Sequence, residues 1–141
     1  MISSFSGRHS FLSNFFPCQV TFEDCPFPTV ENAYQAAKTD NLLERVFFMN
    51  IEPGYAKRLG KKVVLRPDWE QVKEVVMFDL LRQKFENADL CNMLRATGGH
   101  RLVEGNWWHD NFWGNCTCDE CRHIPGKNRL GLMLMQLRDI I

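Results

Sequence analysis

The segment of residues 104–114, EGNWWHDNFWG, combines acidic and aromatic side chains at close spacing. Glu104 and Asp110 are carboxyl groups that can act as acid and base. The three tryptophans between and beside them offer flat faces for stacking on a heterocycle or a sugar. The alternative interpretation is that the tryptophans anchor a core and that Asn, Asp and Gly form turns. The residues alone leave both interpretations open.

A second set of chemistry-bearing residues lies in residues 29–39, TVENAYQAAKT. Helical spacing puts Glu31, Gln35 and Lys38 close to one face. Spacing alone favours a solvated Glu–Lys pair. The alanines of the same segment weigh against that interpretation, because they let another element pack closely. In residues 11–17, Ser13 and Asn14 interrupt an aromatic run, and capping a turn is favoured over reaching into a pocket.

A metal site is one interpretation of the cysteines late in the chain. Cys116, Cys118, Cys121 and His123 are four soft ligands within eight residues, and they could bind a structural zinc ion tetrahedrally. The spacing is tighter than in common zinc motifs, so free thiols on an exposed loop are the favoured alternative. A catalytic cysteine is disfavoured, because the sequence positions no base for it.

Two basic stretches could bind phosphate. Residues 126–131, GKNRLG, precede the last predicted helix, whose backbone amides could hold an anion together with Lys127 and Arg129. A glycine-containing turn with Asn128 as the cap explains the same residues equally well. The basic residues within residues 57–66 are more typical of a solvated face.

Composition limits the class of protein. The chain has 141 residues with 45% hydrophobic content, which predicts one domain over residues 1–141. Seventeen basic and 17 acidic residues cancel, which gives no electrostatic argument for a broad nucleic-acid or membrane surface. We see neither a leader-like start nor an apolar run long enough for a membrane span, so we expect a cytoplasmic protein with reduced cysteines.

The elements that must position these residues are mostly helices. Residues 15–30 predict a hairpin around Glu23 and Asp24. Thr29 is the expected cap of a helix that continues to about Asp40, and Asp68 is the expected cap of a long helix over residues 68–87. Other helices are predicted at residues 42–50, 53–59, 90–96 and 128–141, with a strand at 101–104 and a long aperiodic stretch at 105–128. The fold class predicted is therefore α+β, mainly helical with a small β component.

Taken together, the chain resembles the NADAR (YbiA-like) family. The matching motifs occur in the family's order from about residue 5 to residue 138, and they read FLSNFFP, FPTVENAYQAAKT, AKRLGKKVVLRPDWEQVKEVVM, LLRQKFE, LVEGN, DNFWG and GKNRLGLMLM. The resemblance implies a compact α+β fold that acts on N-glycosidic bonds of ribose-containing ligands. Two reactions are implied: cleavage of the ribosylamino bond of riboflavin-pathway pyrimidine phosphates, or removal of ADP-ribose from guanine in nucleic acid.

The resemblance also implies site residues. Glu31 matches the family's catalytic acid, Lys38 ends the same helix motif, and Asp110 lies in the D-x-x-W-G motif. The positions expected to bind substrate are Asn14, Arg66, Trp69, Trp113 and Asn128. Asn32 stands where histidine is common, and the insert at residues 116–123 departs from many relatives, so neither is assigned a role by resemblance.

These expectations define a hypothesis and two rivals. Glu31 stabilises a cationic sugar or orients water, Asp110 takes the complementary proton transfer, and Lys38 stabilises the opened ribose through an imine. The first alternative is a non-catalytic module that binds ADP-ribose or a related nucleotide. The second is an interaction module whose fold is stabilised by the cysteine loop. We expect no cofactor other than the zinc considered above, and the oligomeric state is not predicted.

Overall fold

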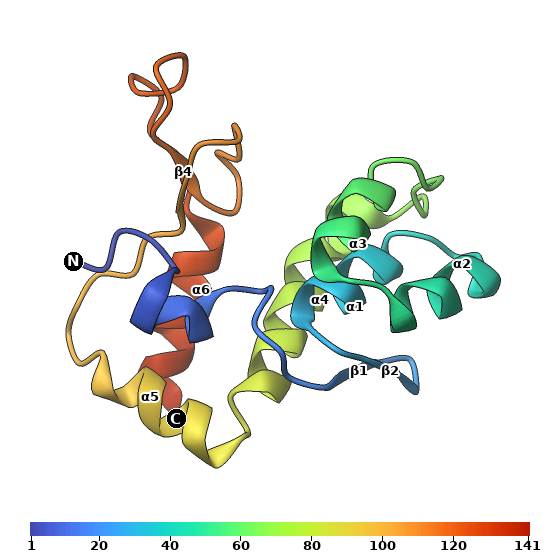
Figure 1. Cartoon of the computed structure of the whole chain (residues 1–141), viewed down its shortest axis with the longest axis horizontal. Coiled ribbons are helices and arrows are strands. Elements are labelled where there is room, and N and C mark those ends of the chain that lie inside the picture. The colour runs from blue at the N-terminus through green and yellow to red at the C-terminus, as the bar shows by residue number, and fades with distance from the viewer. The chain divides into compact units, whose positions relative to one another are not determined.

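The computed structural model describes residues 1–141, which divide into two compact units. One unit contains residues 1–13 and 88–141, and the other contains residues 14–87 (Figure 1). Each unit is described by itself, and a single domain over the whole chain stays a prediction. None of the helices combines the length and the apolar character that crossing a bilayer requires.

The unit of residues 14–87 begins with the predicted hairpin. Strands β1 (Val20–Phe22) and β2 (Cys25–Phe27) pair antiparallel. The two residues between them, Glu23 and Asp24, have φ values of 47° and 68°. Positive φ at both central positions is the geometry of the two-residue turn that matches the twist of a hairpin. The prediction around these two residues is therefore confirmed.

Helix α1 (Val30–Ala37) is the central helix of this unit, and all eight of its residues are buried. It packs against α3 (Pro53–Leu59) and α4 (Trp69–Lys84). The predicted cap is confirmed, because the Thr29 hydroxyl accepts a hydrogen bond of 3.0 Å from the backbone N–H of Asn32. The helix ends about three residues earlier than predicted, in a tighter turn where Thr39 N–H donates to the carbonyl of Ala36.

The remaining helices of the unit follow the sequence signals closely. Residues 42–50 form α2 (Leu42–Phe47) and the short 3₁₀ helix η2 (Phe48–Asn50). Helix α3 has the bounds that were predicted, with Pro53 in its first turn and Gly60 at its C-cap. The end of α3 lies very close to α1. A Cβ added at Gly60 would be only 1.9 Å from Gln35 Oε1, so the close approach requires glycine.

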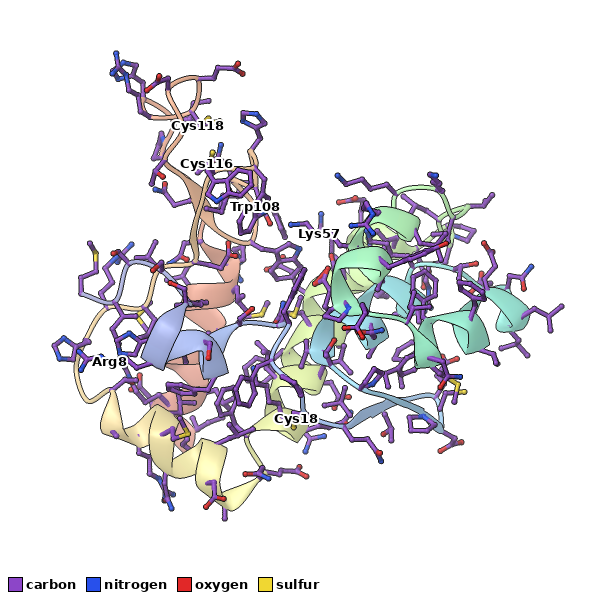
Figure 2. All side chains as sticks on the ribbon, in the orientation of Figure 1. Arg8, Cys18, Lys57, Trp108, Cys116 and Cys118 are labelled. Atoms are coloured by element: carbon purple, nitrogen blue, oxygen red, sulfur yellow. The ribbon has the colours of Figure 1, made fainter.

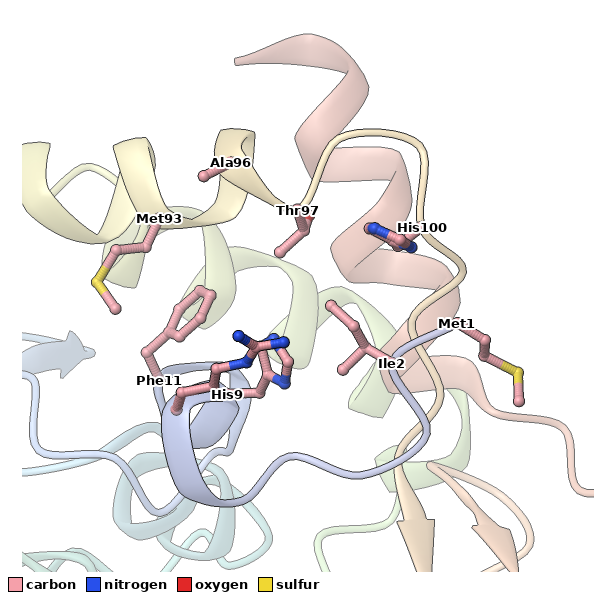
Figure 3. Close-up of a pocket in the computed structure, with 9 residues that line it drawn as sticks. Met1, Ile2, His9, Phe11, Met93, Ala96, Thr97 and His100 are labelled. Carbon is pink, nitrogen blue, oxygen red and sulfur yellow. The ribbon is translucent and has the colours of Figure 1, made fainter.

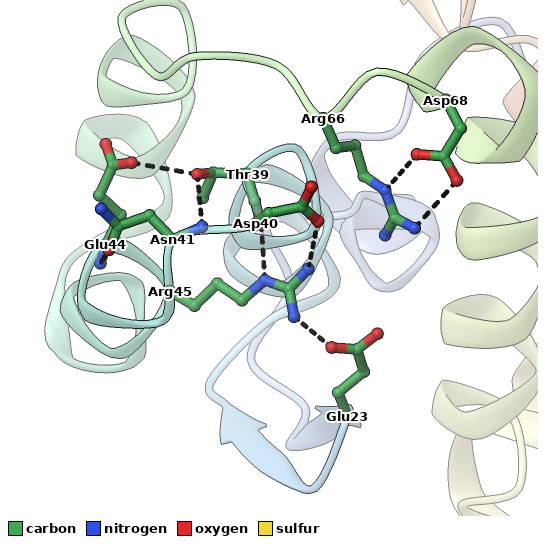
Figure 4. Close-up of polar contacts among 8 residues, drawn as sticks. All are labelled: Glu23, Thr39, Asp40, Asn41, Glu44, Arg45, Arg66 and Asp68. Carbon is green, nitrogen blue, oxygen red and sulfur yellow. Dashed lines mark hydrogen bonds and ion pairs between the residues drawn. The ribbon is translucent and has the colours of Figure 1, made fainter.

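Asp68 occupies the N-cap position of α4, as predicted, but its side chain makes no capping hydrogen bond. Its two carboxylate oxygens instead accept hydrogen bonds from Arg66 Nε and Nη2, at 2.7 and 3.1 Å (Figure 4). A guanidinium two residues away offers a two-pronged, charge-assisted interaction, which outcompetes a bond to the helix backbone. The helix begins at Trp69 and ends at Lys84, inside the predicted range of residues 68–87.

A buried arginine connects α2 to the hairpin. Arg45 is 4% exposed, and its Nε donates to the carbonyl of Thr39 at 2.7 Å. Its guanidinium also pairs with Glu23 in the hairpin turn and lies 3.8 Å from Asp40 (Figure 4). The buried charge is therefore compensated on several sides, as a buried guanidinium requires.

The unit of residues 1–13 and 88–141 is built on helices. It contains the 3₁₀ helix η1 (Gly7–Leu12), α5 (Ala88–Ala96) and α6 (Arg129–Ile140) (Figure 1). One face of α6 is buried through Leu130, Met133, Leu134 and Leu137. Gly131 lies on the same face, where a Cβ would meet the carbonyl of Leu102 at 2.2 Å. Only glycine allows this close approach.

The strand predicted at residues 101–104 is wrong in its position. Leu102 forms only an isolated bridge with Ile2. The N–H of Ile2 donates to the carbonyl of Arg101, and the N–H of Val103 donates to the carbonyl of Ile2, both at 2.8 Å. The regular strands lie just beyond, where β3 (Gly105–Asn106) pairs in parallel with β4 (Asn115–Cys116). Mostly helical structure with two two-stranded sheets confirms the predicted α+β class.

Candidate active site

Glu31 occupies the first turn of α1 and is only 7% exposed. Its backbone N–H donates to the carbonyl of Asn14 at 3.0 Å, and its Oε1 accepts a 2.8 Å hydrogen bond from Gln35 Nε2. The N-terminal end of a helix favours a negative charge, which offsets part of the cost of burial. An acid is thereby held in a fixed position within a fully buried helix.

Lys38 follows α1 as its C-cap residue and is half-buried. Burial lowers the pKa of Lys38 below its usual value, and the negative charge of Glu31 opposes this shift. The positive charges of Lys61 and Lys73 lower the pKa of Lys38 further. A lowered pKa increases the fraction of free amine, which is the nucleophilic form of lysine.

One aromatic ring lies beside Lys38, and a second ring packs against the first. Its Nζ is 5.7 Å from the centroid of the Tyr34 ring, and that ring is 5.2 Å from the ring of Trp69. Trp69 was predicted as a site residue, whereas Tyr34 was not. Tyr34 lies three residues after Glu31 and four before Lys38, so the helical spacing that grouped those two could also have identified it.

Arg66 lies next to Lys38 through the backbone. Its N–H donates to the carbonyl of Lys38 at 2.7 Å, while its guanidinium is engaged with the half-exposed carboxylate of Asp68. This pairing raises the pKa of Arg66 and lowers that of Asp68. Pairs of this kind near water contribute little stability, so the guanidinium can exchange its carboxylate for another anion.

Two buried oxygen atoms around Glu31 have no hydrogen-bond partner. They are Asn14 Oδ1 and Gln35 Oε1, from the residues that contact the backbone and the carboxylate of Glu31. The Asn14 amide nitrogen donates only to the sulfur of Met77, at 3.6 Å. Buried acceptors are nearly always satisfied in folded proteins. Gln35 Oε1 lies against Gly60, so Asn14 Oδ1 is the oxygen of the two that a ligand with a hydroxyl or amine donor can satisfy.

The predicted residues of the other unit lie in loops. Asp110 Oδ1 accepts hydrogen bonds from the N–H groups of Phe112 and Trp113, at 3.1 and 2.9 Å. The Trp113 ring packs edge-on against Phe112 at 4.9 Å. Trp107 and Trp108 are exposed and contact each other. In this loop one carboxylate oxygen of Asp110 closes a turn, and the tryptophans do not form a common core.

Asn128 is 2% exposed and bonds only to backbone atoms with its side chain. Its Nδ2 donates to the carbonyl of Leu102 at 2.9 Å, and its Oδ1 accepts from Glu104 N–H at 3.0 Å. Its φ of 50° suits asparagine, which tolerates the left-handed region. These contacts explain the residue without a ligand, so its role in substrate binding stays a prediction from sequence.

The fourth member of the cysteine cluster differs from the prediction. His109 lies against Cys116, Cys118 and Cys121, whereas His123 does not belong to the group. His123 is exposed and accepts a hydrogen bond from Arg122 at 3.3 Å. Sequence proximity favoured His123, but the pairing of β3 with β4 brings the loop after β3 to the cysteines instead.

Two surface cavities contain none of the predicted site residues. One, of about 450 Å³, is lined by residues including His9, Phe11, Thr97 and His100 (Figure 3). The other, of about 390 Å³, lies between the segment that starts at Phe15 and the residues around Pro53. The candidate site around Glu31 is therefore described by its buried polar groups, which neither of these two cavities reaches.

Comparison with known proteins now places the chain in a family. The NADAR domain model matches residues 4–141, so the chain belongs to the NADAR family. Its fold resembles the NMR structure of the Escherichia coli protein YbiA, with a TM-score of 0.83 and 36% sequence identity over 99% of this chain and 82% of that one.

Relatives with assigned names agree with this placement. The N-glycosidase YbiA of Escherichia coli is 37% identical over 140 residues, which cover 96% of this chain and 84% of that protein. A riboflavin biosynthesis protein of Vibrio vulnificus is 34% identical over 136 residues, and the chloroplastic riboflavin biosynthesis protein PYRR of Zea mays is 37% identical over 148. These matches cover 94% and 92% of this chain, but only 35% and 23% of the two larger proteins.

Proposed function

We propose that this chain is an N-glycosidase that hydrolyses the bond between ribose phosphate and the amino group of a pyrimidine. Membership of the NADAR family and the names of the relatives support the reaction class. Two of the relatives are named for riboflavin biosynthesis, which favours a ribosylamino-pyrimidine phosphate over ADP-ribosylated guanine. The observation that carries the proposal is the buried Glu31 with Lys38 seven residues later on the same helical segment.

Glu31 provides the negative charge that this reaction requires. Breaking an N-glycosidic bond generates positive charge at the anomeric carbon, and a fixed carboxylate stabilises that charge more strongly in the transition state than in the substrate. Gln35 keeps one oxygen of Glu31 in place, at 2.8 Å. The same carboxylate can orient the water that attacks the anomeric carbon.

Lys38 provides a covalent route. A ribosylamine opens to an imine between the anomeric carbon and the pyrimidine nitrogen. The free amine of Lys38 adds to this carbon, and the pyrimidine amine leaves with a proton. Water then hydrolyses the resulting lysine imine, which releases the ribose phosphate aldehyde and regenerates the amine. Burial of Lys38, which lowers its pKa, favours the free amine that this step needs.

The surroundings suit the rest of the ligand. The unpaired oxygen of Asn14 can accept a hydrogen bond from a ribose hydroxyl, whereas that of Gln35 lies against Gly60. Lys61 and Lys73 are near enough to influence Lys38, and together with Arg66 they can bind the phosphate. Tyr34 lies beside Lys38, and Trp69 packs against Tyr34 and can stack on the pyrimidine. Roles for Asp110, Trp113 and Asn128 remain predictions from sequence, because these residues lie in the other unit.

Product analysis by mass spectrometry tests the function and the substrate together. The protein is incubated in parallel with a ribosylamino-pyrimidine phosphate and with DNA that carries ADP-ribosylated guanine. We expect release of the free pyrimidine amine and ribose phosphate from the first substrate. Release of ADP-ribose from the DNA alone would contradict the choice of substrate. Binding of both without cleavage would favour the non-catalytic module.

A trapping experiment tests the covalent route. Borohydride added during turnover reduces an imine to a stable amine, so Lys38 is expected to gain the mass of a reduced ribose phosphate. The Lys38→Arg variant should give no adduct, and the exposed Lys62 should remain unmodified in the wild-type protein. Turnover without any adduct would contradict the role of Lys38 and would leave Glu31 as the group that acts on the sugar.

A further inference from the structure

We propose that His109, Cys116, Cys118 and Cys121 bind one structural zinc ion. The four potential ligand atoms all lie within 4.8 Å of one another. His109 Nδ1 is 3.3 Å from Cys118 Sγ and 3.4 Å from Cys121 Sγ. Three thiols and one imidazole form a common donor set of structural zinc sites.

The distances fit a tetrahedral ion. With Zn–S bonds of about 2.3 Å and Zn–N bonds of about 2.0 Å, a tetrahedral site separates sulfur from nitrogen by about 3.5 Å. The two observed separations between His109 and the sulfurs are within about 0.3 Å of that value. Each of the three cysteines is a free thiol, so no disulfide competes for these sulfur atoms.

The backbone brings the ligands together from two segments. Parallel pairing of β3 with β4 sets Asn106 opposite Cys116, and His109 follows three residues after Asn106. The N–H of His109 then donates to Cys116 Sγ at 3.3 Å. Hydrogen bonds from backbone N–H groups stabilise a thiolate, which is the form that binds zinc.

The other two thiols come from a turn after β4. Cys121 N–H donates to the carbonyl of Cys118 at 3.1 Å, which folds this turn back toward Cys116. Figure 2 shows Cys116 and Cys118 near each other on this loop. Cys116 and Cys121 are buried, whereas Cys118 is half-buried and His109 is exposed. The site is therefore open enough for an ion to enter and is still mostly shielded from water.

The backbone of His109 takes a conformation that few residue types favour. Its φ is 70°, in the left-handed region, where asparagine, aspartate and histidine are enriched among the non-glycine residues. This conformation places the imidazole beside the sulfurs. A bound ion would fix the loop that contains Asp110, whose side chain accepts hydrogen bonds from the N–H groups of Phe112 and Trp113 in the same loop.

Metal analysis of the reduced full-length protein tests the site. We expect about one zinc ion per chain by elemental mass spectrometry. Cobalt(II) should replace it and give the intense visible absorption of a tetrahedral thiolate site. The sharpest variant is His109→Asn, because asparagine tolerates the same φ while removing the imidazole ligand.

His123→Asn is the matched control. We expect His109→Asn to weaken zinc binding by more than about 100-fold, since even loss of a supporting contact costs 10- to 100-fold. His123→Asn should keep the wild-type affinity and the cobalt spectrum. Circular dichroism identifies any variant that has failed to fold, and Cys118→Ser then serves as the second ligand variant. Reduced, folded protein that binds neither metal would overturn the proposal, as would equal losses in both histidine variants. Neither result depends on the glycosidase reaction.

Discussion

The protonation state of Lys38 determines whether its amine can attack the sugar in the proposed reaction. Burial lowers its pKa, so its free-amine form appears at lower pH than for an exposed lysine. If the amine attacks the sugar, the rate of hydrolysis must rise with pH as Lys38 loses its proton. We expect this rising limb to fall below the usual lysine value of 10.5.

The Lys38→Arg variant separates charge from nucleophilicity. Arginine keeps a positive charge near Glu31 but stays protonated and cannot form an imine. We expect a loss of kcat of at least about 100-fold and disappearance of the rising limb. A pH–rate profile of the variant that matches the wild type would show that Lys38 has another role.

At the residue scale, part of the candidate site could be predicted from the sequence. Helical spacing was enough to group Glu31, Gln35 and Lys38 on one segment, and the structure adds the hydrogen bond that fixes the first two. His109 was missed because it precedes the cysteines by seven positions, whereas His123 follows Cys121 by two, and only strand pairing brings His109 and Cys116 together. The unpaired oxygens of Asn14 and Gln35 also depend on packing that no local pattern contains.

At the scale of elements, the N-termini of α1 and α4 allow the contribution of a side-chain cap to stability to be tested. Thr29 caps α1 with its hydroxyl, whereas Asp68 precedes α4 without a side-chain cap. We expect Thr29→Ala to lower the free energy of unfolding by about 1–2 kcal/mol. Asp68→Ala should cost clearly less than Thr29→Ala, because it removes only an exposed ion pair that water and salt screen. Urea unfolding of both variants measures the difference, and equal losses would contradict this account of the two caps.

The boundaries of the elements were predictable where the signal is local. Pro53 and Gly60 fixed both ends of α3, and Thr29 fixed the start of α1. Asp68 is at the N-cap of α4, but its side chain makes no capping hydrogen bond, because Arg66 binds the carboxylate instead. The strand expected at residues 101–104 failed because its partner is Ile2, about one hundred residues earlier in the chain. Pairing over such a separation leaves no local pattern.

At the scale of the whole molecule, Lys84 predicts how stability depends on pH. Its side chain is fully buried at the end of α4, and this burial lowers its pKa to about 7. The unfolded chain binds this proton more tightly than the folded one, so the free energy of unfolding should rise as pH increases above about 7. The largest slope from one such group is about 1.4 kcal/mol per pH unit.

Urea unfolding between about pH 7 and 9 measures this slope. Lys84→Met keeps an apolar side chain of similar length and should reduce the slope to the part that the lowered pKa of Lys38 contributes, and Lys62→Met, at an exposed position, should leave it unchanged. Above that range Cys18 acts in the opposite direction, because burial raises the pKa of its thiol from 9.0. An unchanged slope in Lys84→Met would mean that the lysine is not the source of the pH dependence.

The most direct test of the central claim is the rate of N-glycosidic hydrolysis by Glu31→Gln. Glutamine keeps the size of the side chain and an oxygen that can accept the hydrogen bond from Gln35, but it removes the charge. With a ribosylamino-pyrimidine phosphate as substrate, we expect kcat to fall by at least about 100-fold, and the exposed Glu52→Gln control should keep the wild-type rate. A folded Glu31→Gln protein that releases the pyrimidine amine at near wild-type rate would contradict the account.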